Sequence, residues 1–423
     1  MLDIKFIKEN EQIVNKSLKD RGIKIGIDIL LDLYEKRKTL LIKAEDLKYK
    51  KNLASAEIAN LVREKKDSRA KIDSMKVISQ KIKGIDKKVG ELGQKIREIS
   101  LTIPNIPHPS VPVGSEPAAN KIVRQHKDLP KLKFEPRTHL EIGEALGIMD
   151  FGRASKLVGS HFSLFKGQGA KLERALINFM LDLHTRKHNY VEIWPPSLVN
   201  RSSMTGTGQL PKLEEDMYRL KDEDYFLVPT AEVPLTNIHQ NEILKEDDLP
   251  IYYTAYTPCF RREAGSYGKE TKGLVRVHQF DKVELVKFVR PESSSDELES
   301  LLKDAQKVLE LLELPYRVVL LPTRGISFAA AKCYDLEVWA PGIKRWLEVS
   351  SCSMFNDFQA RRANIKYKPK TGAKPQYVHT LNGSGVALAR TVAALLENFQ
   401  QRDGNVKLPK ALVPYMDGRN KIE

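Results

Sequence analysis

Residues 75–99 read MKVISQKIKGIDKKVGELGQKIREI, and apolar side chains recur along them at alternating intervals of three and four residues. The positions are Met75, Ile78, Ile82, Ile85, Val89, Leu92, Ile96 and Ile99. This heptad spacing is typical of a helix that packs along a seam against another helix. Gly84, Gly90 and Gly93 interrupt the segment, and each glycine costs about 1 kcal/mol inside a helix. We therefore expect a long helix that bends or frays near these glycines.

A second heptad pattern lies upstream of residue 75. One seam consists of Leu33, Leu40, Leu47, Ala54 and Leu61, and the alternate seam of Leu30, Ala44 and Ile58 is interrupted by Arg37 and Lys51. A polar break from Lys65 to Arg69 separates the two patterns. Two heptad helices with a short polar link predict an antiparallel hairpin, and its first helix, over residues 29–63, would be roughly 50 Å long. That length indicates a projecting arm; a coiled coil between two chains is the alternative.

Four prolines follow within nine residues, at Pro104, Pro107, Pro109 and Pro112. Such a stretch cannot continue a helix and is typical of a stiff, extended linker. We therefore expect a helical arm over residues 1–103, a proline-rich linker over residues 104–114 and a second domain over residues 115–423.

The positive charge of the chain is concentrated in the predicted arm. The whole chain has a formal net charge of +15, and residues 1–100 contain 25 Lys and Arg against 16 Asp and Glu. A basic segment favours a polyanionic partner, although a solvated basic helix surface explains the charge equally well.

The number of cysteines and the hydropathy of the chain indicate the cellular compartment of the protein. Cys259, Cys333 and Cys352 are odd in number and widely spaced, so we expect reduced, buried thiols and no structural zinc. No stretch approaches the ~18 consecutive apolar residues of a membrane span, and the first residues lack the apolar core of a signal peptide. These features predict a cytoplasmic protein.

Beyond the prolines, strand-like segments alternate with blocks of helix. The strand-like segments are residues 190–194, 225–228, 275–289, 317–321, 334–338 and 346–350, and helical patterns cover residues 171–188, 297–312 and 386–400. This arrangement predicts an α+β domain with a largely antiparallel sheet. The chain has no phosphate-loop or dinucleotide-binding motif. His184 and His188 stand four residues apart without the glutamate of a zinc-protease motif, so we expect both on the surface.

Four segments of the second domain combine polar side chains with strand-like or glycine-rich surroundings. They are residues 260–284, residues 228–232, residues 348–353, and residues 380–385 with Arg390. Arginine suits phosphate oxygens, an aromatic ring such as Phe280 can stack on a base, and Glu348 beside hydroxyls could hold a hard cation. The small residues before the last helix would favour an anion. Taken singly, each pattern is equally explained by surface ion pairs, an edge strand or a tight turn.

Taken together and in this order, the segments resemble the bacterial-type seryl-tRNA synthetases, and the resemblance covers essentially the whole chain. Phe260-Arg261-Arg262-Glu263, the loop after it, and Arg276 with Phe280 resemble motif 2 of the class II aminoacyl-tRNA synthetases; Gly383-Ser384-Gly385 through Arg390 resembles motif 3; and the helix ending at Trp194-Pro195-Pro196 resembles motif 1. Thr230-Ala231-Glu232 and Glu348-Val349-Ser350-Ser351 resemble segments characteristic of the seryl enzymes, which makes the resemblance specific within class II.

This resemblance implies an α+β fold in which an N-terminal antiparallel helical hairpin, or coiled-coil arm, precedes a class II domain with an antiparallel sheet flanked by helices. It implies ATP-dependent activation of L-serine to seryl-adenylate and transfer of the seryl group to serine tRNA. The arm would contact the long variable arm of the tRNA, mainly through phosphates, so binding would be salt-sensitive. The family also implies a homodimer with motif 1 at the interface, and Mg²⁺ bound with ATP.

The resemblance further assigns nucleotide-binding residues. Arg261 would hold the α-phosphate during the reaction, Arg276 and Arg390 would hold the outer phosphates, and Arg261 and Arg390 would be the catalytic residues. Glu263 would read the adenine edge, Phe280 would stack on the ring and Val277 would contribute backbone contacts. Arg262, Val349 and Ser350 complete the implied ATP-binding set, in which Glu348 and Ser351 would bind Mg²⁺.

The implied serine pocket is formed by Thr230, Ala231, Glu232, Arg261, Glu284, Asn382 and Ser384. Glu232 would bind the ammonium group and Glu284 the hydroxyl group. A buried carboxylate that awaits a hydroxyl would reject alanine, because alanine would leave it unpaired. Threonine would have to be excluded by size.

Two other functions compete with this interpretation. A catalytically inactive, RNA-binding paralogue would be expected to lack the phosphate-binding arginines or the pocket glutamates, and Arg261, Arg390, Glu232 and Glu284 are all present. A ligase that loads a carrier protein instead of tRNA would not need the basic hairpin.

Overall fold

The computed structural model describes residues 1–130, 132–264 and 273–423. Within them the chain forms two compact units, Leu2–Pro104 and Asn105–Glu423, with Met1 counted in the second. The first unit consists of α1 (Ile4–Glu9), α2 (Glu11–Asp20), α3 (Asp28–Arg63) and α4 (Arg69–Thr102). Across residues 1–130, 132–264 and 273–423, none of the helices has the length and hydropathy of a membrane span.

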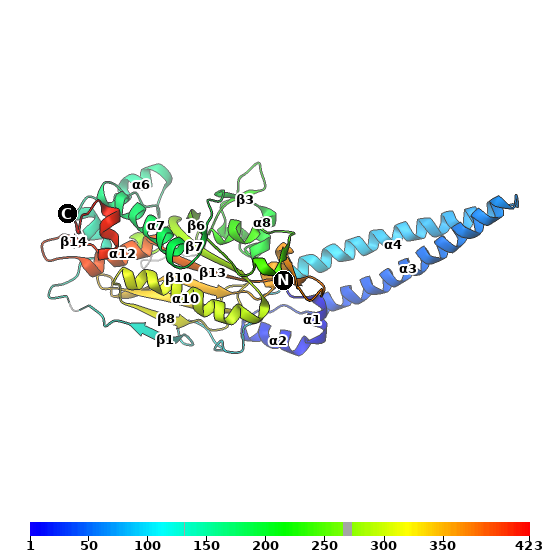
Figure 1. Ribbon diagram of the computed structural model, residues 1–423, viewed down its shortest axis with the longest axis horizontal. Coiled ribbons are helices and arrows are strands. Elements are labelled where there is room, and N and C mark those ends of the chain that lie inside the picture. The colour runs from blue at the N-terminus through cyan, green and yellow to red at the C-terminus, as the bar shows by residue number, and fades with distance from the viewer. Residues whose placement is uncertain (131, 265–272) are drawn as a thin grey trace. The chain divides into compact units, whose positions relative to one another are not determined.

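The helices α3 and α4 run alongside each other and form the hairpin that the heptad patterns predict (Figure 1). Ala44 of α3 and Ile82 of α4 are buried. The predicted fraying is wrong, because α4 continues through all three glycines. A Cβ at Gly93 would lie 3.4 Å from Nε of Arg37, one of the two residues that interrupt the seam of α3, which is an ordinary contact distance.

An eight-stranded sheet forms the centre of the second unit, in the order β1-β8-β9-β10-β13-β7-β6-β2. Its strands are β1 (Lys121–His126), β2 (Val191–Glu192), β6 (Ile251–Phe260), β7 (Gln279–Val289), β8 (Tyr316–Leu320), β9 (Lys332–Ala340), β10 (Arg345–Met354) and β13 (His379–Ala387). Neighbouring strands are antiparallel except for β2 and β6, which are parallel. The predicted α+β class with a largely antiparallel sheet is therefore confirmed.

The three longest helices that the structure describes in this unit pack against the sheet: α7 (Gln168–Lys187), α10 (Ser294–Leu311) and α12 (Leu388–Phe399). Their apolar side chains join every second residue of the strands in one core, as Leu301 of α10 does with Val283 and Leu285 of β7. Because successive side chains of a strand point to opposite faces, the intervening residues of β7 point away from this core. Figure 1 shows α10 lying along the sheet.

Smaller elements complete the unit. They are α5 (His139–Ala145), α6 (Phe151–Val158), α8 (Arg201–Thr207), α9 (Glu232–Asn237), α11 (Phe358–Ala363), β3 (Leu198–Asn200), β4 (Tyr225–Leu227), β5 (Ile243–Lys245), β11 (Lys366–Lys368), β12 (Gln376–Tyr377), β14 (Val406–Lys407) and β15 (Lys421–Ile422). The proline-rich stretch lies against the same unit: Nδ2 of the buried Asn105 donates to the carbonyl oxygens of Ala329, at 2.9 Å, and Phe355, at 2.8 Å.

Two local expectations about residues 380–385 and the histidines are wrong. Residues 380–385 are not a turn before a helix but part of β13, and the helix begins at Leu388. A side chain at Gly383 would overlap Leu301, so this glycine allows α10 to pack closely against the sheet. His184 is fully buried, and its Nδ1 lies 3.0 Å from Nδ1 of His188, because the inner face of α7 packs on the core.

Some predicted boundaries also differ. The helix before Trp194 ends at Lys187, and the short strand β2 lies between them. The strand expected from residue 275 begins at Gln279, after a 3₁₀ turn over Gly273–Val275. All three cysteines are buried and free, as expected.

Candidate active site

A cleft of about 490 Å³ is lined by residues from all four polar segments that the sequence singles out. Of the predicted site residues, it brings together Thr230, Glu232, Arg261, Glu263, Arg276, Val277, Phe280, Glu284, Glu348, Val349, Ser350, Ser351, Asn382, Ser384 and Arg390. Ala231 and Arg262 do not line it. Ala231 is buried before α9, and the exposed Arg262 donates to the carbonyl oxygen of Glu215 at 3.1 Å. The glycine-bearing loop, residues 265–268, lies outside the described residues.

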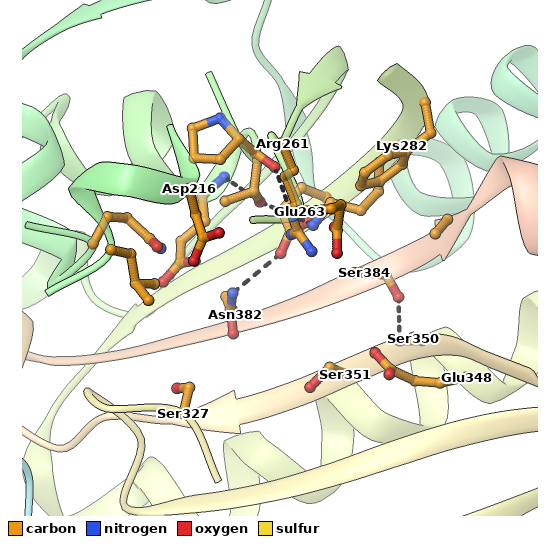
Figure 2. A pocket seen from close by; sticks show the side chains of 18 of the residues that line it. Asp216, Arg261, Glu263, Lys282, Ser327, Glu348, Ser350, Ser351, Asn382 and Ser384 are labelled. Atoms are coloured by element: carbon orange, nitrogen blue, oxygen red, sulfur yellow. Dashed lines mark hydrogen bonds and ion pairs between the residues drawn. The ribbon is translucent and has the colours of Figure 1, made fainter. Parts of the chain in front are cut away.

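The strand register places the side chains of β7 and β13 on one face. Phe280 and Glu284 of β7 are an even number of residues apart, so both point into the cleft. Ser384 of β13 is paired with Glu284, and Asn382 lies two residues before Ser384 on the same face. Figure 2 shows Asn382 and Ser384 on one strand, facing Arg261 across the cleft.

A β-bulge in β10 brings Glu348 and Ser351 to the same face. In a regular strand, residues three apart point to opposite faces. Here Glu348 is opposite Glu337 of β9, whereas Ser351 is opposite Asp335, because the register shifts between Glu348 and Ser350. Glu337 and Asp335 are two residues apart and share a face, so their partners share one too. Both Glu348 and Ser351 therefore line the cleft.

One part of the cleft, which we call the buried end, contains Thr230, Glu232, Lys282, Glu284, Asn382 and Ser384. Lys282 Nζ lies 2.6 Å from Glu284 Oε2, and the side chains are 7% and 1% exposed. Thr230 Oγ1 accepts a hydrogen bond from Lys282 at 2.9 Å and donates to Glu284 Oε2 at 3.3 Å. Asn382 Nδ2 donates to the other oxygen, Oε1, at 3.2 Å. Glu284 is thus held by donors from three separate segments.

Glu232 has a different set of neighbours. Burial, and secondarily the nearby charge of Glu284, raises the pKa of Glu232 to about 7. Its Oε1 accepts a hydrogen bond from Nε2 of Gln359 at 2.7 Å. The amide of Gln359 is oriented by Thr380 Oγ1, which donates to its Oε1 at 2.7 Å, and by the carbonyl oxygen of Thr207, which accepts from its Nε2 at 3.1 Å.

The exposed end of the cleft contains Glu263, Arg276, Glu348 and Arg390. Arg276 Nη1 pairs with Glu263 Oε2 at 2.8 Å, and these side chains are 36% and 23% exposed. Arg390 Nη1 donates to the carbonyl oxygen of Glu348 at 2.8 Å and lies 3.5 Å from its Oε2. The carboxylate partners of both arginines are partially exposed, so a ligand anion can compete with them.

Arg261 and Phe280 adjoin both ends. The Arg261 guanidinium lies 5.3 Å from the centre of the Phe280 ring, and its Nε donates to the carbonyl oxygen of Pro229 at 3.3 Å. Its positive charge also lowers the pKa of Glu232, against the larger effect of burial. The remaining guanidinium nitrogens of Arg261 and the flat face of Phe280 suit a phosphate and a purine ring.

A magnesium ion fits the donor set on β10. The Glu348 carboxylate and the Ser351 hydroxyl share one face, and Mg²⁺ commonly takes one or two protein oxygens while phosphates and water supply the rest. Among the residues that the structure describes, no cluster of three or more His, Cys, Asp or Glu side chains is arranged to hold a metal by itself.

Two of the polar residues at the buried end that sequence reasoning missed are Lys282 and Gln359. Lys282 could have been found, because it precedes Glu284 by two residues and so shares its face of the strand. Gln359 gave no local signal: it lies on α11, 127 residues from the glutamate to which it donates. Only the tertiary packing of α11 beside α9 and β13 identifies it.

The family models match two parts of the chain. Residues 1–107 match the "Seryl-tRNA synthetase N-terminal domain", and residues 215–399 match the "tRNA synthetase class II core domain (G, H, P, S and T)".

Full-length relatives agree with both models. The chain is 54% identical to the serine–tRNA ligase of Geobacter sulfurreducens over 422 residues, which is 100% of each chain. Among solved structures, it is similar to the seryl-tRNA synthetase of Pyrococcus horikoshii complexed with ATP, with a TM-score of 0.92, 38% identity and coverage of 100% of this chain and 99% of that one. It also matches the cytoplasmic serine–tRNA ligase of Naegleria fowleri in complex with AMP, with a TM-score of 0.88, 27% identity and the same coverage. Together with the geometry of the cleft, these similarities establish that the chain belongs to the seryl-tRNA synthetase family of class II aminoacyl-tRNA synthetases.

Proposed function

We propose that the chain activates L-serine with ATP to give seryl-adenylate and pyrophosphate, and then transfers the seryl group to serine tRNA. The observation that carries this proposal is the division of the cleft. Two buried carboxylates, Glu232 and Glu284, lie at one end, and Arg276 and Arg390 lie at the other. This distribution matches an amino acid with an ammonium and a hydroxyl group, joined to a polyphosphate.

The buried end recognises serine. Glu232 binds the ammonium group, because its partner Gln359 is neutral and leaves the carboxylate charge uncompensated by direct pairing. Glu284 Oε1 accepts a hydrogen bond from the serine hydroxyl group. In the protein alone this oxygen receives one hydrogen bond, from Asn382 Nδ2 at 3.2 Å. Thr230 and Ser384 close the pocket.

The rest of the cleft binds ATP. Phe280 stacks on adenine, Glu263 and Val277 contact its edge, and Arg276 and Arg390 exchange their present partners for the outer phosphates. Glu348 and Ser351 hold Mg²⁺, which neutralises phosphate charge when bound.

Arg261 acts at the reacting centre. A carboxylate oxygen of serine attacks the α-phosphorus, the bond to the bridging oxygen breaks and pyrophosphate leaves. Negative charge builds up on the α-phosphate oxygens in the transition state, and the fixed guanidinium of Arg261 stabilises it there. Binding both substrates in one cleft also supplies the orientation that the reaction needs. A ribose hydroxyl of the tRNA then attacks the seryl carbonyl, and AMP leaves.

The helical hairpin binds the tRNA in this proposal. Residues 1–103 form the tRNA-binding arm, residues 104–114 the linker and residues 115–423 the catalytic domain of a cytoplasmic homodimer. The excess of basic over acidic residues in 1–100 supports contact with a phosphate backbone.

Exchange of labelled pyrophosphate into ATP tests the first step directly. The assay is run with a panel of amino acids, with Mg²⁺ and without tRNA. Exchange that depends on serine alone is expected. Folded protein that is silent with every amino acid would instead favour the inactive RNA-binding paralogue.

Deletion of residues 30–100 tests the role of the arm. Serine-dependent exchange is expected to continue at the rate of the full chain, because the cleft lies wholly within Asn105–Glu423. Charging of full-length serine tRNA is expected to be lost. Normal charging by the truncated protein would contradict the role of the arm.

A further inference from the structure

Lys282 is a buried cation inside the candidate serine pocket, and neither the catalytic mechanism nor ATP binding requires it. Its ammonium lies 2.6 Å from Glu284 Oε2 and donates to Thr230 Oγ1 at 2.9 Å. The side chain is only 7% exposed. The carboxylate proposed to meet the serine hydroxyl is therefore already neutralised by the protein itself.

The two carboxylates of the buried end consequently differ in charge balance. Glu284 has a cation in direct contact, whereas the direct partner of Glu232 is the neutral amide of Gln359. A ligand with a single ammonium group balances the charges of the buried end when that group pairs with Glu232. A second ammonium at Glu284 would lie beside the buried Lys282, where like charges repel more strongly than in water.

The two carboxylate oxygens of Glu284 differ in the number of protein groups that contact them. Oε2 is taken by Lys282 and Thr230, while Oε1 receives only the bond from Asn382 Nδ2. The Asn382 amide oxygen is buried without a hydrogen-bond partner among the described residues. A neutral hydroxyl group, which both donates and accepts, fits such surroundings.

From this geometry we infer that Lys282 is a specificity-determining residue: its charge makes the pocket accept a neutral hydroxymethyl side chain and reject an aminomethyl side chain of the same size. The excluded substrate class is amino acids with an amine on the β-carbon, represented by 2,3-diaminopropionate. Size cannot reject this compound, because its amine occupies the place of the serine hydroxyl. The inference rests on the proposed function and deepens it.

The test replaces Lys282 and compares two amino acids. Pyrophosphate exchange is measured with L-serine and with L-2,3-diaminopropionate, at a slightly acidic pH where both amines are protonated. The wild-type protein should exchange pyrophosphate into ATP with serine. It should show no exchange with diaminopropionate, and diaminopropionate should not inhibit exchange with serine. In Lys282→Met, the ratio of kcat/KM for diaminopropionate to that for serine should rise at least 100-fold, because the ligand now supplies the cation that Glu284 has lost.

A charge-balanced double variant is the matched control. Lys282→Met combined with Glu284→Gln removes both charges and leaves the pair neutral, as it is in the wild type. The preference for serine over diaminopropionate should return toward the wild-type ratio, even though overall activity is lower. A purely structural role for Lys282 predicts no such return.

Each result has a distinct meaning. A wild-type protein without serine-dependent exchange would refute the proposed function, whatever the variants do. Two outcomes would overturn the inference while leaving the proposed function intact. In the first, folded Lys282→Met shows serine-dependent exchange but the ratio of kcat/KM for diaminopropionate to that for serine is unchanged. In the second, this ratio stays high in the double variant. Where Lys282→Met does not fold, Lys282→Gln keeps a hydrogen-bond donor for Thr230 and should show the same rise. Competitive inhibition of the wild-type protein by diaminopropionate near the KM for serine would overturn the inference without any variant.

Discussion

The two ends of the cleft handle charge in opposite ways. At the buried end, Lys282 and Glu284 are 7% and 1% exposed and are fixed by neighbours on other segments. At the exposed end, Arg390 and Glu348 are 28% and 48% exposed and pair at 3.5 Å. Breaking a buried pair costs about 3–5 kcal/mol, whereas an exposed pair contributes about 0–1 kcal/mol.

Because its two ends differ in this way, one cleft can be both selective and adaptable. Buried charges that are costly to rearrange keep one geometry and so select a small ligand by its charge and hydrogen bonds. Exposed arginines lose little when they leave a glutamate for a phosphate, so they can bind ATP and release pyrophosphate. Four predictions test this contrast, in order of decreasing effect.

Glu284→Ala should abolish the selectivity of the buried end. We expect kcat/KM for serine to fall by roughly 10³-fold, about 4 kcal/mol, because the hydroxyl loses its acceptor and Lys282 is left buried without its partner. Pyrophosphate exchange measures this loss, and binding of an ATP analogue should change less than about threefold, which is within about 0.7 kcal/mol. Thermal unfolding provides the control for folding. Equal losses in serine activation and nucleotide binding would contradict the separation of the two ends.

Arg261→Ala removes the cation that adjoins both ends. Loss of one preorganised donor at the reacting atoms typically costs about 10²-fold or more in kcat, and we expect roughly 10² here. The KM for serine should change little, because the contacts of Glu232 and Glu284 remain. Arg261→Lys is the matched control and should recover only part of the rate, since an ammonium cannot donate two parallel bonds. A change confined to KM would assign Arg261 to ground-state binding.

The pKa of Glu232, raised by burial to about 7, predicts a pH dependence specific to the buried end. Below this pH the carboxyl group is protonated and cannot pair with the serine ammonium. The kcat/KM for serine should therefore fall about tenfold per unit as the pH drops further below 7. Gln359→Leu is the matched variant: it removes a hydrogen bond that lowers this pKa, so the fall should begin at a higher pH. If the pH profile of kcat/KM for serine is the same in Gln359→Leu as in the wild type, Glu232 is not the group that causes it.

The same group affects stability with a definite sign. The folded chain keeps a proton on Glu232 up to about pH 7, whereas the unfolded chain releases it near 4.5. The stabilising contribution of this group is thus fully present below pH 4.5 and is lost as the pH rises to about 7.

Arg276→Met should have the smallest effect. The pair with Glu263 is partly exposed, so the free energy of unfolding should change by less than about 1 kcal/mol. The KM for ATP should rise by roughly tenfold, about 1.4 kcal/mol, through the loss of a phosphate contact, while the KM for serine stays constant. Glu263→Gln removes the same ion pair and keeps Arg276, so it is the control for the effect of the pair on the free energy of unfolding. A large fall in stability would show that the exposed end is as rigid as the buried end.

Local patterns predicted the arm better than the cleft. The heptad repeat located both helices of the hairpin, because a helix seam depends on residues three and four apart. The polar segments were also recognisable, but their geometry was not. A spacing of three between Glu348 and Ser351 places them on opposite faces of a regular strand, and only the bulge in β10 brings them together.

Periodicity, charge and short motifs in the sequence indicate the two-part organisation, the α+β class and the four polar segments that contribute to the cleft. The partners and the burial of individual side chains follow instead from tertiary packing. The buried position of His184, the close packing of Gly383 on α10, the amide of Gln359 beside Glu232 and the Lys282–Glu284 pair all depend on which strands and helices become neighbours. Burial and pairing are properties of assembled surfaces, so segments distant in sequence acquire them only when the chain folds.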